Sequence, residues 1–487
     1  MFGKNRKFYI TTTLPYVNAD PHIGFALEII QADVVARYHK SLGEDVFFNT
    51  GVDEHGLKIF RKAQESNLDP QAYCDIYAKK FDDLKQALNL SYNNFIRTTD
   101  PHHIKAAQEF WNRCFKNGDI YKKNYKIKYC VGCELEKTDS ELVDGKCPIH
   151  PNLEIEIIDE ENYFFKYSKY QKSLLDLYKK RPRGYPEFVV PESKQKEIAM
   201  FTERGLEDFS ISRLKEKMPW GVPVPNDDKQ VMYVWFDALT NYVTCLGWPE
   251  DEKNFKDFWP GLQVAGKDNL RQQTSMWQAM LMSAGLPNSR QVFIHGHVMS
   301  GGQKMSKSLG NVINPFDLVK KYGTDAVRYY LLRELHPTED SDFTYEKFEQ
   351  RYNSDLAGGI GNLVARTIGI FSKISNLESE IPTNAKNYKL QKAIEKVKKD
   401  YKKAIEEFKF NDALFAVWEI IAFCDKYINE EKLWETKKPE VISDLFYAIK
   451  EIGILLEPFL PQTAEKIKNA VETKQSENLF PKIIVVK

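Results

Sequence analysis

A short segment near the start of the chain carries side chains suited to chemistry on phosphates. In Pro21-His22-Ile23-Gly24-Phe25, a histidine and a glycine stand where apolar periodicity predicts a helix from about residue 24 to residue 38. A helix N-terminus attracts anions, the histidine adds a hydrogen-bond donor, and the glycine allows a ligand to approach the backbone closely. Alone, the pattern is more typical of an ordinary turn histidine.

A second segment, far downstream, supplies positive charge. In Lys304-Met305-Ser306-Lys307-Ser308, two lysines stand in a loop that follows Gly301-Gly302, and the glycines favour loop movement. Mobile cations and donors are what stabilise the charge on phosphoryl oxygens during transfer. Alone, this segment is more typical of a solvated loop; the two segments in this order on a βαβ scaffold favour a role in binding phosphates.

A cluster of cysteines and a histidine has the spacing of a metal site. Cys130-Val-Gly-Cys133 and Cys147-Pro-Ile-His150 give the pattern Cys-x2-Cys-x13-Cys-x2-His. Two knuckles of this length close on one tetrahedral ion, and four protein ligands leave no open position. The pattern therefore predicts one structural Zn²⁺ held by Cys130, Cys133, Cys147 and His150.

The elements that position these residues begin with a βαβ unit. Residues 7–14 read as a buried strand, the helix follows, and residues 45–49 read as the next strand. Such a crossover predicts a parallel sheet, in which ligands bind beyond the carboxyl ends of the strands, where His22 and Asp53 fall. Further strands of this sheet are expected at residues 231–235, 263–266 and 291–295.

The predicted fold class is α/β. It combines a doubly wound, Rossmann-like parallel-sheet catalytic domain, a zinc-bearing insertion and a C-terminal all-α bundle. The expected regions are residues 1–115 and 226–348 for the two halves of the catalytic domain, 116–225 for the insertion and 349–487 for the helical domain.

Composition indicates a globular protein of several domains. The 487 residues are 42% hydrophobic and 28% charged, with a formal net charge of zero. No stretch reaches the apolar length of a membrane span and no signal core precedes residue 8, so a cytoplasmic location without membrane contact is expected. An RNA partner would need local patches; residues 179–183 and 396–409 are candidates, although mixed charge in the second favours a solvated helix face.

Four segments of the chain resemble one family. Residues 13–18, 50–56, 234–238 and 266–268 are similar to segments of methionyl-tRNA synthetases, which are class I aminoacyl-tRNA synthetases, and the phosphate-site segments match the two signatures of that class. The resemblance implies ATP-dependent ligation of methionine to tRNA(Met) through a methionyl-adenylate, with release of AMP and pyrophosphate. ATP with Mg²⁺ would be the nucleotide.

The resemblance also implies roles for individual residues. His22, Lys304 and Lys307 would be catalytic. The ATP-binding residues would be His22, Gly24, Glu28, Asp268, Lys304, Ser306 and Lys307. The methionine-binding residues would be Leu14, Tyr16, Asp53, Trp235, Ala238, Tyr242 and Gln273. A thioether favours aromatic edges, and a buried ammonium needs a carboxylate such as Asp53, which agrees with this set.

Two positions in the expected site depart from the family pattern. Phe25 replaces the second histidine of the first signature, and Gln273 replaces a histidine that lies against the methionine side chain. A phenylalanine cannot donate a hydrogen bond, whereas a glutamine amide can. We therefore expect methionine use to be retained with a changed set of polar contacts.

The helical C-terminal region is expected to read the anticodon. The resemblance implies that Asn362 and Arg366, one helical turn apart, and Trp434 contact the CAU bases. Unstacked bases need an aromatic platform and donors for their edges. The expected partners are tRNA(Met), including initiator tRNA, and methionine, and a monomer is expected.

Two other readings remain open at this stage. One is a synthetase for another apolar amino acid, such as leucine or isoleucine, although those usually carry a large editing insertion. The other is a non-catalytic tRNA-binding paralogue, suggested by Phe25 and Gln273. His22, Asp53 and Lys304 argue against the paralogue.

Overall fold

The computed structural model describes residues 6–133, 135–137, 139–179, 187–305, 310–373, 384–475 and 477–484. The chain divides into two compact units. The first comprises residues 1–21, 43–85 and 92–294, and the second comprises residues 22–42, 86–91 and 295–487. In the described part of the chain, no helix is both long and apolar enough to cross a membrane.

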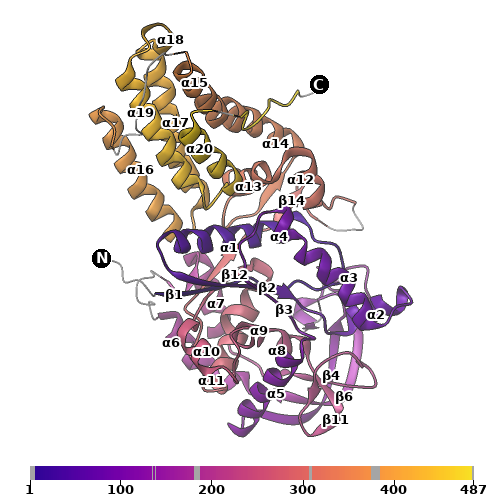
Figure 1. Ribbon diagram of the computed structural model, residues 1–487. Coiled ribbons are helices and arrows are strands. Elements are labelled where there is room, and N and C mark those ends of the chain that lie inside the picture. The colour runs from indigo at the N-terminus through magenta and orange to yellow at the C-terminus, as the bar shows by residue number, and fades with distance from the viewer. Residues whose placement is uncertain are drawn as a thin grey trace. The chain divides into compact units, whose positions relative to one another are not determined.

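A six-stranded sheet organises the first unit (Figure 1). Strand β1 pairs in parallel with β2 on one side and with β12 on the other, β2 pairs in parallel with β3, and β13 pairs in parallel with β7. The strands, in spatial order, are β3 (Asn94–Arg97), β2 (Asp45–Val52), β1 (Lys7–Thr11), β12 (Leu262–Gly266), β13 (Gln291–His295) and β7 (Val189–Val190). The predicted parallel sheet is confirmed.

One expected strand of this sheet is wrong. Residues 231–235 do not continue it, because β11 (Asp227–Met232) pairs antiparallel with β9 (Ser212–Leu214) and β10 (Pro223–Val224) in a separate sheet. The chain then turns at Tyr233 into the short helix α8 (Val234–Ala238). The apolar run was compatible with either state, since short apolar runs do not distinguish strand from buried helix.

A long antiparallel pair carries the cysteine cluster. Strand β4 (Ile120–Cys130) pairs with β6 (Glu156–Phe165) along its length, and β5 (Leu135–Lys137) and β8 (Phe209–Ser210) flank them. Cys130 is the last residue of β4, so the cluster lies in the loops at that end. The other helices of the first unit are α2 (Leu57–Glu65), α3 (Pro70–Asp82), α5 (Pro101–Lys116), α6 (Gln171–Lys179), α7 (Glu192–Glu203), α9 (Asn241–Thr244), α10 (Glu252–Phe258) and α11 (Trp277–Ser283).

Aromatic packing anchors α8 to the first unit's core. Phe236 is fully buried and contacts both Phe110 and Trp111 edge-on, at ring-centroid distances of 5.9 and 5.3 Å. Phe110 in turn stacks on Trp277. Because buried aromatic pairs contribute beyond their area, this cluster fixes the helix whose neighbouring residues were expected to bind methionine.

The second unit contains the predicted helical bundle. Helices α16 (Tyr388–Glu406), α17 (Phe410–Glu430), α19 (Pro439–Leu456) and α20 (Pro461–Thr473) lie side by side in Figure 1. In α16, Asn387 caps the N-terminus and the buried residues recur every three or four positions, which is the pattern of a helix with one apolar face. The remaining elements are α1 (Ile23–Ser41), β14 (Val298–Ser300), β15 (Gln303–Lys304), α12 (Pro315–Tyr322), α13 (Thr324–Arg333), β16 (Ser341–Phe343), α14 (Tyr345–Arg351), α15 (Asn362–Phe371) and α18 (Leu433–Thr436).

A buried ion pair holds α1 within the second unit. Arg328 of α13 is fully buried and donates from Nη2 to Asp33 Oδ2 of α1 at 2.8 Å. Its other N–H groups donate to the carbonyl oxygens of Leu88, Pro458 and Phe459 at 3.1, 3.0 and 2.7 Å. One guanidinium thus joins four segments.

The partners of Asp33 keep it ionised. Burial alone raises the pKa of this carboxyl, but the charges of Arg328 and Arg37 and the hydrogen bonds from Ser91 outweigh burial, and the pKa lies below its ordinary value. The Ser91 backbone N–H and hydroxyl both donate to Oδ1 at 2.6 Å, and Arg37 Nε donates to Oδ2 at 2.8 Å. All lone pairs of the carboxylate are therefore directed at donors.

We expect Arg328→Met to lower the free energy of unfolding of the second unit by about 3–5 kcal/mol, because it removes the main partner of a buried carboxylate. The measurement is urea denaturation combined with amide hydrogen exchange in α1. The control is Lys402→Met, which breaks an exposed ion pair with Glu406 and should cost about 1 kcal/mol or less. Equal effects of the two substitutions would contradict the assigned role of Arg328.

Candidate active site, metal centre and RNA-binding face

The first signature segment forms the N-terminus of α1. His22 is the N-cap, and its Nδ1 accepts a hydrogen bond from the Gly24 backbone N–H at 3.0 Å. Since Nδ1 accepts, the ring proton lies on Nε2, and the residue as a whole is exposed. A Cβ on Gly24 would lie 2.8 Å from His22 Cε1, so the glycine is what permits this ring position.

The second unit brings the two signature segments together. The Ile23 backbone N–H donates to Ile313 O at 3.1 Å, and a Cβ on Gly24 would lie 3.7 Å from Met305 Cε. Lys304 is exposed at the end of β15. Ser306 and Lys307 lie outside the described residues.

Phe25 is buried, with 9% of its surface exposed, so at this position the chain has a core residue where the resembling family has a donor.

Glu28, which follows the signature segment along α1, forms a buried polar pair with His295. Glu28 Oε2 lies 2.9 Å from His295 Nε2, while His295 Nδ1 donates to Gly296 O at 2.7 Å. Both ring nitrogens of His295 thus lie within hydrogen-bond distance of an oxygen acceptor. Sequence reasoning identified Glu28 and missed His295.

All seven residues expected to bind methionine line one cavity of the first unit. Its volume is ≈ 30 Å³, and its lining is Thr13, Leu14, Tyr16, Asp53, Trp235, Ala238, Leu239, Asn241, Tyr242, Asn269 and Gln273. Four of these residues, Thr13, Leu239, Asn241 and Asn269, were not predicted. They are neighbours of predicted residues in the chain, which is the signal that could have found them.

The cavity has aromatic lining residues and buried polar atoms that lack hydrogen-bond partners among the described residues. The Tyr16 and Trp235 rings meet edge-on with centroids 6.4 Å apart. Gln273 Nε2 donates to the Tyr242 hydroxyl at 2.6 Å. Within the described residues, Gln273 Oε1 and Trp235 Nε1 are buried without a hydrogen-bond partner. Such atoms are costly unless a ligand or water satisfies them, which indicates a binding site.

Asp53 is the acidic group of this cavity. The residue is 3% exposed, and Oδ1 accepts from the His55 backbone N–H at 3.3 Å and from the Thr98 hydroxyl at 3.4 Å. Asp268, by contrast, is exposed in the turn at Lys267–Asn269 that follows β12. Gln273 stands on a π-helical turn, Gln272–Met276, and such turns are frequent at functional sites.

The buried carboxylate of Asp237 holds α8 in place. Asp237 Oδ2 lies 2.6 Å from His55 Nδ1, and Oδ1 lies 2.9 Å from His103 Nε2. Burial raises the pKa of Asp237, but the charge of His55 and hydrogen bonds from both histidines outweigh burial and lower the pKa to about 2. Trp235 and Ala238 of the cavity stand on the same helix, so Asp237 positions them.

We expect Asp237→Asn to lower the free energy of unfolding by about 1–3 kcal/mol at pH 7, because an amide N–H would face a histidine donor inside the core. The folded-state pKa of Asp237 lies below the unfolded one, so its stabilisation is complete above about pH 4 and is lost as the pH falls toward about 2. The variant should therefore lose less stability than the wild type across that pH range. Urea titration measures both effects.

The matched control for Asp237→Asn is Asp257→Asn, which removes an exposed carboxylate paired with Lys253 and should change stability by less than about 1 kcal/mol. If both variants unfold at the same urea concentration, Asp237 does not anchor α8.

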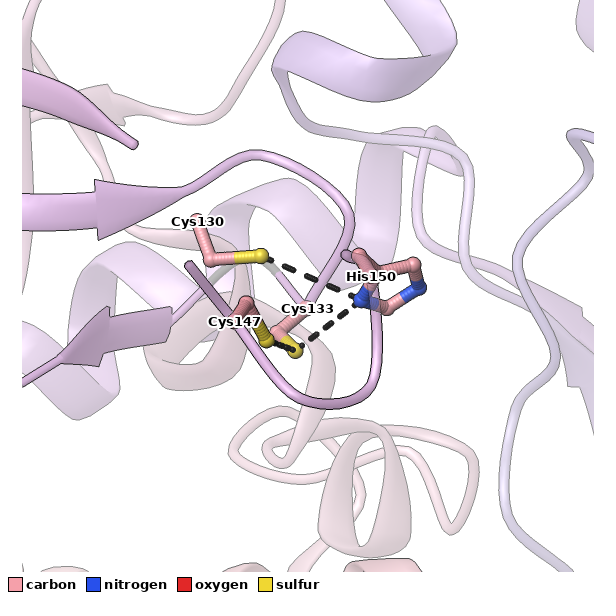
Figure 2. Close-up of side chains that lie close together, drawn as sticks. All are labelled: Cys130, Cys133, Cys147 and His150. Atoms are coloured by element: carbon pink, nitrogen blue, oxygen red, sulfur yellow. Dashed lines mark hydrogen bonds between the residues drawn. The ribbon is translucent and has the colours of Figure 1, made fainter. Parts of the chain in front are cut away.

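The predicted metal ligands come together. Cys130, Cys133, Cys147 and His150 each offer a ligand atom, and these atoms all lie within 4.8 Å of one another (Figure 2). The Cys133 Sγ–Cys147 Sγ, Cys130 Sγ–His150 Nδ1 and Cys133 Sγ–His150 Nδ1 distances are 3.5, 3.8 and 3.2 Å. A tetrahedral ion with Zn–S bonds of about 2.3 Å separates its ligands by about 3.8 Å, so the cluster fits zinc.

The expected anticodon residues lie on the second unit. Asn362 is exposed at the start of α15, and Arg366 one turn later contacts α17, with Nη2 donating to Asn429 Oδ1 at 3.1 Å and Nη1 lying 3.6 Å from Asp425 Oδ1. Trp434 stands in α18, just beyond the end of α17, and is 48% exposed. An exposed tryptophan offers a face on which a base can stack.

The lysine-rich run at residues 396–409 forms ion pairs with acids rather than a basic patch. Lys396 pairs with Glu419 at 2.9 Å and with Asp400 at 3.3 Å, and Lys402 and Lys403 pair with acids one turn later. This agrees with a solvated helix face. Of the other candidate patch, residues 180–183 lie outside the described residues.

Comparison with known proteins defines the class. A family model described as "tRNA synthetases class I (M)" matches residues 8–157 and 152–368, and one described as "Anticodon-binding domain of tRNA ligase" matches residues 387–483. The fold and site therefore define a class I tRNA synthetase.

Curated relatives and solved structures narrow the class further. The chain is 43% identical over 479 residues to the methionine–tRNA ligase of Thermosynechococcus vestitus, covering 94% of this chain and 89% of that protein, and 40% identical over 482 residues to that of Thermotoga maritima, covering 96% and 76%. The structure of Mycobacterium tuberculosis methionyl-tRNA synthetase in complex with methionyl-adenylate matches with a TM-score of 0.90 at 33% identity, covering 98% of this chain and 100% of that one. The apo form of the same enzyme matches with a TM-score of 0.83, at 30% identity and 98% coverage of both chains. This chain belongs to the methionine–tRNA ligase family.

Proposed function

We propose that the chain activates methionine with ATP to form methionyl-adenylate and pyrophosphate, and then transfers the methionyl group to tRNA(Met) with release of AMP. The observation that carries this proposal is the cavity in which all seven expected methionine-binding residues meet. Among the described residues that line it, Asp53 alone is acidic, and it suits a substrate ammonium, which needs a carboxylate when it leaves water. Tyr16 and Trp235 offer aromatic edges to the thioether.

Binding of methionine requires the cavity to open. A volume of ≈ 30 Å³ holds about one or two water molecules, which is less than a thioether side chain occupies. Tyr16 and Trp235 are both half-buried lining residues, so we expect a rotamer change in one of them to enlarge the site. The unpartnered Trp235 Nε1 and Gln273 Oε1 then gain partners from the substrate or its water.

The signature segments of the second unit serve the nucleotide. His22 Nε2–H and the N-terminus of α1 donate to phosphate oxygens, and Lys304 adds positive charge as pyrophosphate leaves. The proposed nucleotide set is completed by Gly24, Glu28, Asp268, Ser306 and Lys307. His295 contacts Glu28. Mg²⁺ would accompany ATP, because phosphate and water oxygens are the ligands it prefers.

We propose that Asn362, Arg366 and Trp434 read the anticodon, supported by the match of residues 387–483 to an anticodon-binding domain. The two tRNAs with a CAU anticodon, initiator and elongator, would both be substrates of a cytoplasmic monomer. The four regions bounded at residues 115, 225 and 348 remain our proposal for its functional division.

The test is ATP–pyrophosphate exchange with each of the twenty amino acids. Methionine alone should support exchange, and Asp53→Asn should reduce kcat/KM for methionine by about 30-fold or more, because the substrate ammonium loses its charged partner. The control is Asp20→Asn, which changes an exposed acid in the turn before α1 and should have little effect. Equal exchange with another apolar amino acid would assign a different substrate, and no exchange with any would favour a tRNA-binding paralogue.

A structural Zn²⁺ held by Cys130, Cys133, Cys147 and His150 completes the proposal. Its chemistry there is to close the two loops at the end of β4 on one another, with no part in a reaction step. Gly132 is essential to this geometry, because a Cβ at that position would lie 2.5 Å from His150 Cγ.

We expect Gly132→Ala to displace the His150 ring and to lower zinc content from about one ion per chain to less than half of that. Metal analysis by mass spectrometry after gel filtration measures the content directly. Gly369→Ala is the control, since a Cβ there meets nothing within 4 Å. Full zinc content in Gly132→Ala would contradict the proposed ligand set.

A further inference from the structure

A second glutamine, Gln278, contacts the turn that carries Gln273. Residues Gln272–Met276 form a π-helical turn, after which the Trp277 backbone N–H donates to Gln272 O, five residues back. In an α-helix that N–H would donate to Gln273 O, four residues back. The π-turn therefore moves this donor away from the Gln273 carbonyl.

The Gln278 side chain supplies a donor to that carbonyl. Gln278 is fully buried in α11, and its Nε2 donates to Gln273 O at 2.8 Å. The same Nε2 also donates to Ser289 Oγ at 3.0 Å. Its Oε1 accepts from the Ser289 backbone N–H at 3.1 Å and from Asn288 Nδ2 at 3.2 Å. Both N–H groups and both lone pairs of this amide thus have partners.

These partners fix which way round the Gln278 amide lies. If the amide were turned by half a rotation, its oxygen would face the oxygen of Gln273 and its N–H groups would face the N–H of Ser289, and both contacts are repulsive. Ser289 is itself anchored, because its Oγ donates to Gln263 Oε1 of β12 at 2.7 Å. The donor to the Gln273 carbonyl is thereby tied to the central sheet.

The π-turn decides where the Gln273 side chain lies. Gln273 lines the cavity, and its Nε2 donates to the Tyr242 hydroxyl at 2.6 Å. Relaxation of the π-turn to an α-helix would rotate this residue by about 100° around the helix axis, the angle of one residue, and so turn it off the cavity. Glutamine is rarely fully buried, so an interior glutamine that donates to this turn indicates a positioning role for Gln278.

We propose that Gln278 is a positioning residue for methionine. By donating to Gln273 O it stabilises the π-turn, and the π-turn keeps the Gln273 amide in the cavity beside Tyr242. Gln278 is not among the described residues that line the cavity, so it acts through Gln273 rather than by touching the substrate. This inference rests on the proposed function and adds to it a residue outside the cavity that determines methionine affinity.

The test is Gln278→Met in the full chain, assayed by methionine-dependent ATP–pyrophosphate exchange. Methionine at this position keeps the length of the side chain and removes its hydrogen bonds. We expect KM for methionine to rise about tenfold, with kcat and KM for ATP within about twofold of the wild type, because the change reaches the substrate only through Gln273.

The matched control is Gln291→Met. Gln291 is also fully buried, and its Nε2 likewise donates to a backbone carbonyl, Glu187 O at 2.8 Å, which lies outside the π-turn. This variant should leave KM for methionine within about twofold of the wild type, because it removes an equivalent hydrogen bond without touching the turn.

A double-mutant cycle separates positioning from a general loss of structure. In a Gln273→Ala background, Gln278→Met should raise KM for methionine by less than about twofold, because the side chain that it positions is absent. An equal rise of KM in both backgrounds would overturn the proposal, and so would an unchanged KM when Gln273 is present.

Ser289→Ala is a milder variant that keeps the proposal testable if Gln278→Met does not fold. It removes one acceptor of the Gln278 amide and the link to Gln263, and it should raise KM for methionine about threefold. No change of KM in Ser289→Ala would then overturn the proposal. If the wild type shows no exchange with methionine, the proposed function itself fails and the positioning role fails with it; exchange with unchanged KM in the variants overturns the positioning role alone.

Discussion

The second unit depends on one buried charge, the carboxylate of Asp33. A carboxylate inside a protein is tolerated only when its oxygens meet donors, and Asp33 has them from Arg328, Arg37 and Ser91. The remaining N–H groups of Arg328 donate hydrogen bonds to carbonyl oxygens of two further segments. Through this network, α1, whose N-cap is His22, is fixed within the unit that contains Lys304. The chemistry of the signature motifs thus rests on an ion pair that takes no part in it.

The first unit repeats this principle around its cavity. Asp237 is held by His55 and His103, and it fixes the short helix that carries Trp235 and Ala238. Among the described residues, Trp235 Nε1 and Gln273 Oε1 of the cavity are buried without hydrogen-bond partners, so the cavity is rigidly supported but has polar atoms left to satisfy. A selective binding site needs rigidly held residues together with polar atoms that lack partners, because binding then restores hydrogen bonds that only a matching ligand can make.

Replacement of the two usual histidines has different structural consequences. Phe25 is buried in the core, so this position offers no polar group. Gln273 stays in the cavity and forms a new contact with the Tyr242 hydroxyl. One departure therefore removes a donor, and the other exchanges a titratable ring for an amide that keeps its hydrogen-bonding capacity at every pH.

Features that depend on local pattern could be predicted from the sequence. Short spacing predicted a metal site at Cys130 and His150, the change of period from strand to helix predicted the βαβ unit, and three- and four-residue periodicity predicted the helical bundle. Which distant polar groups meet depends on how the whole chain packs. His295 lies 267 residues from Glu28 and Asp237 lies 182 from His55, and no local periodicity encodes such pairs. The misassigned strand at 231–235 has the same cause, since packing against distant segments settles the state of a short apolar run.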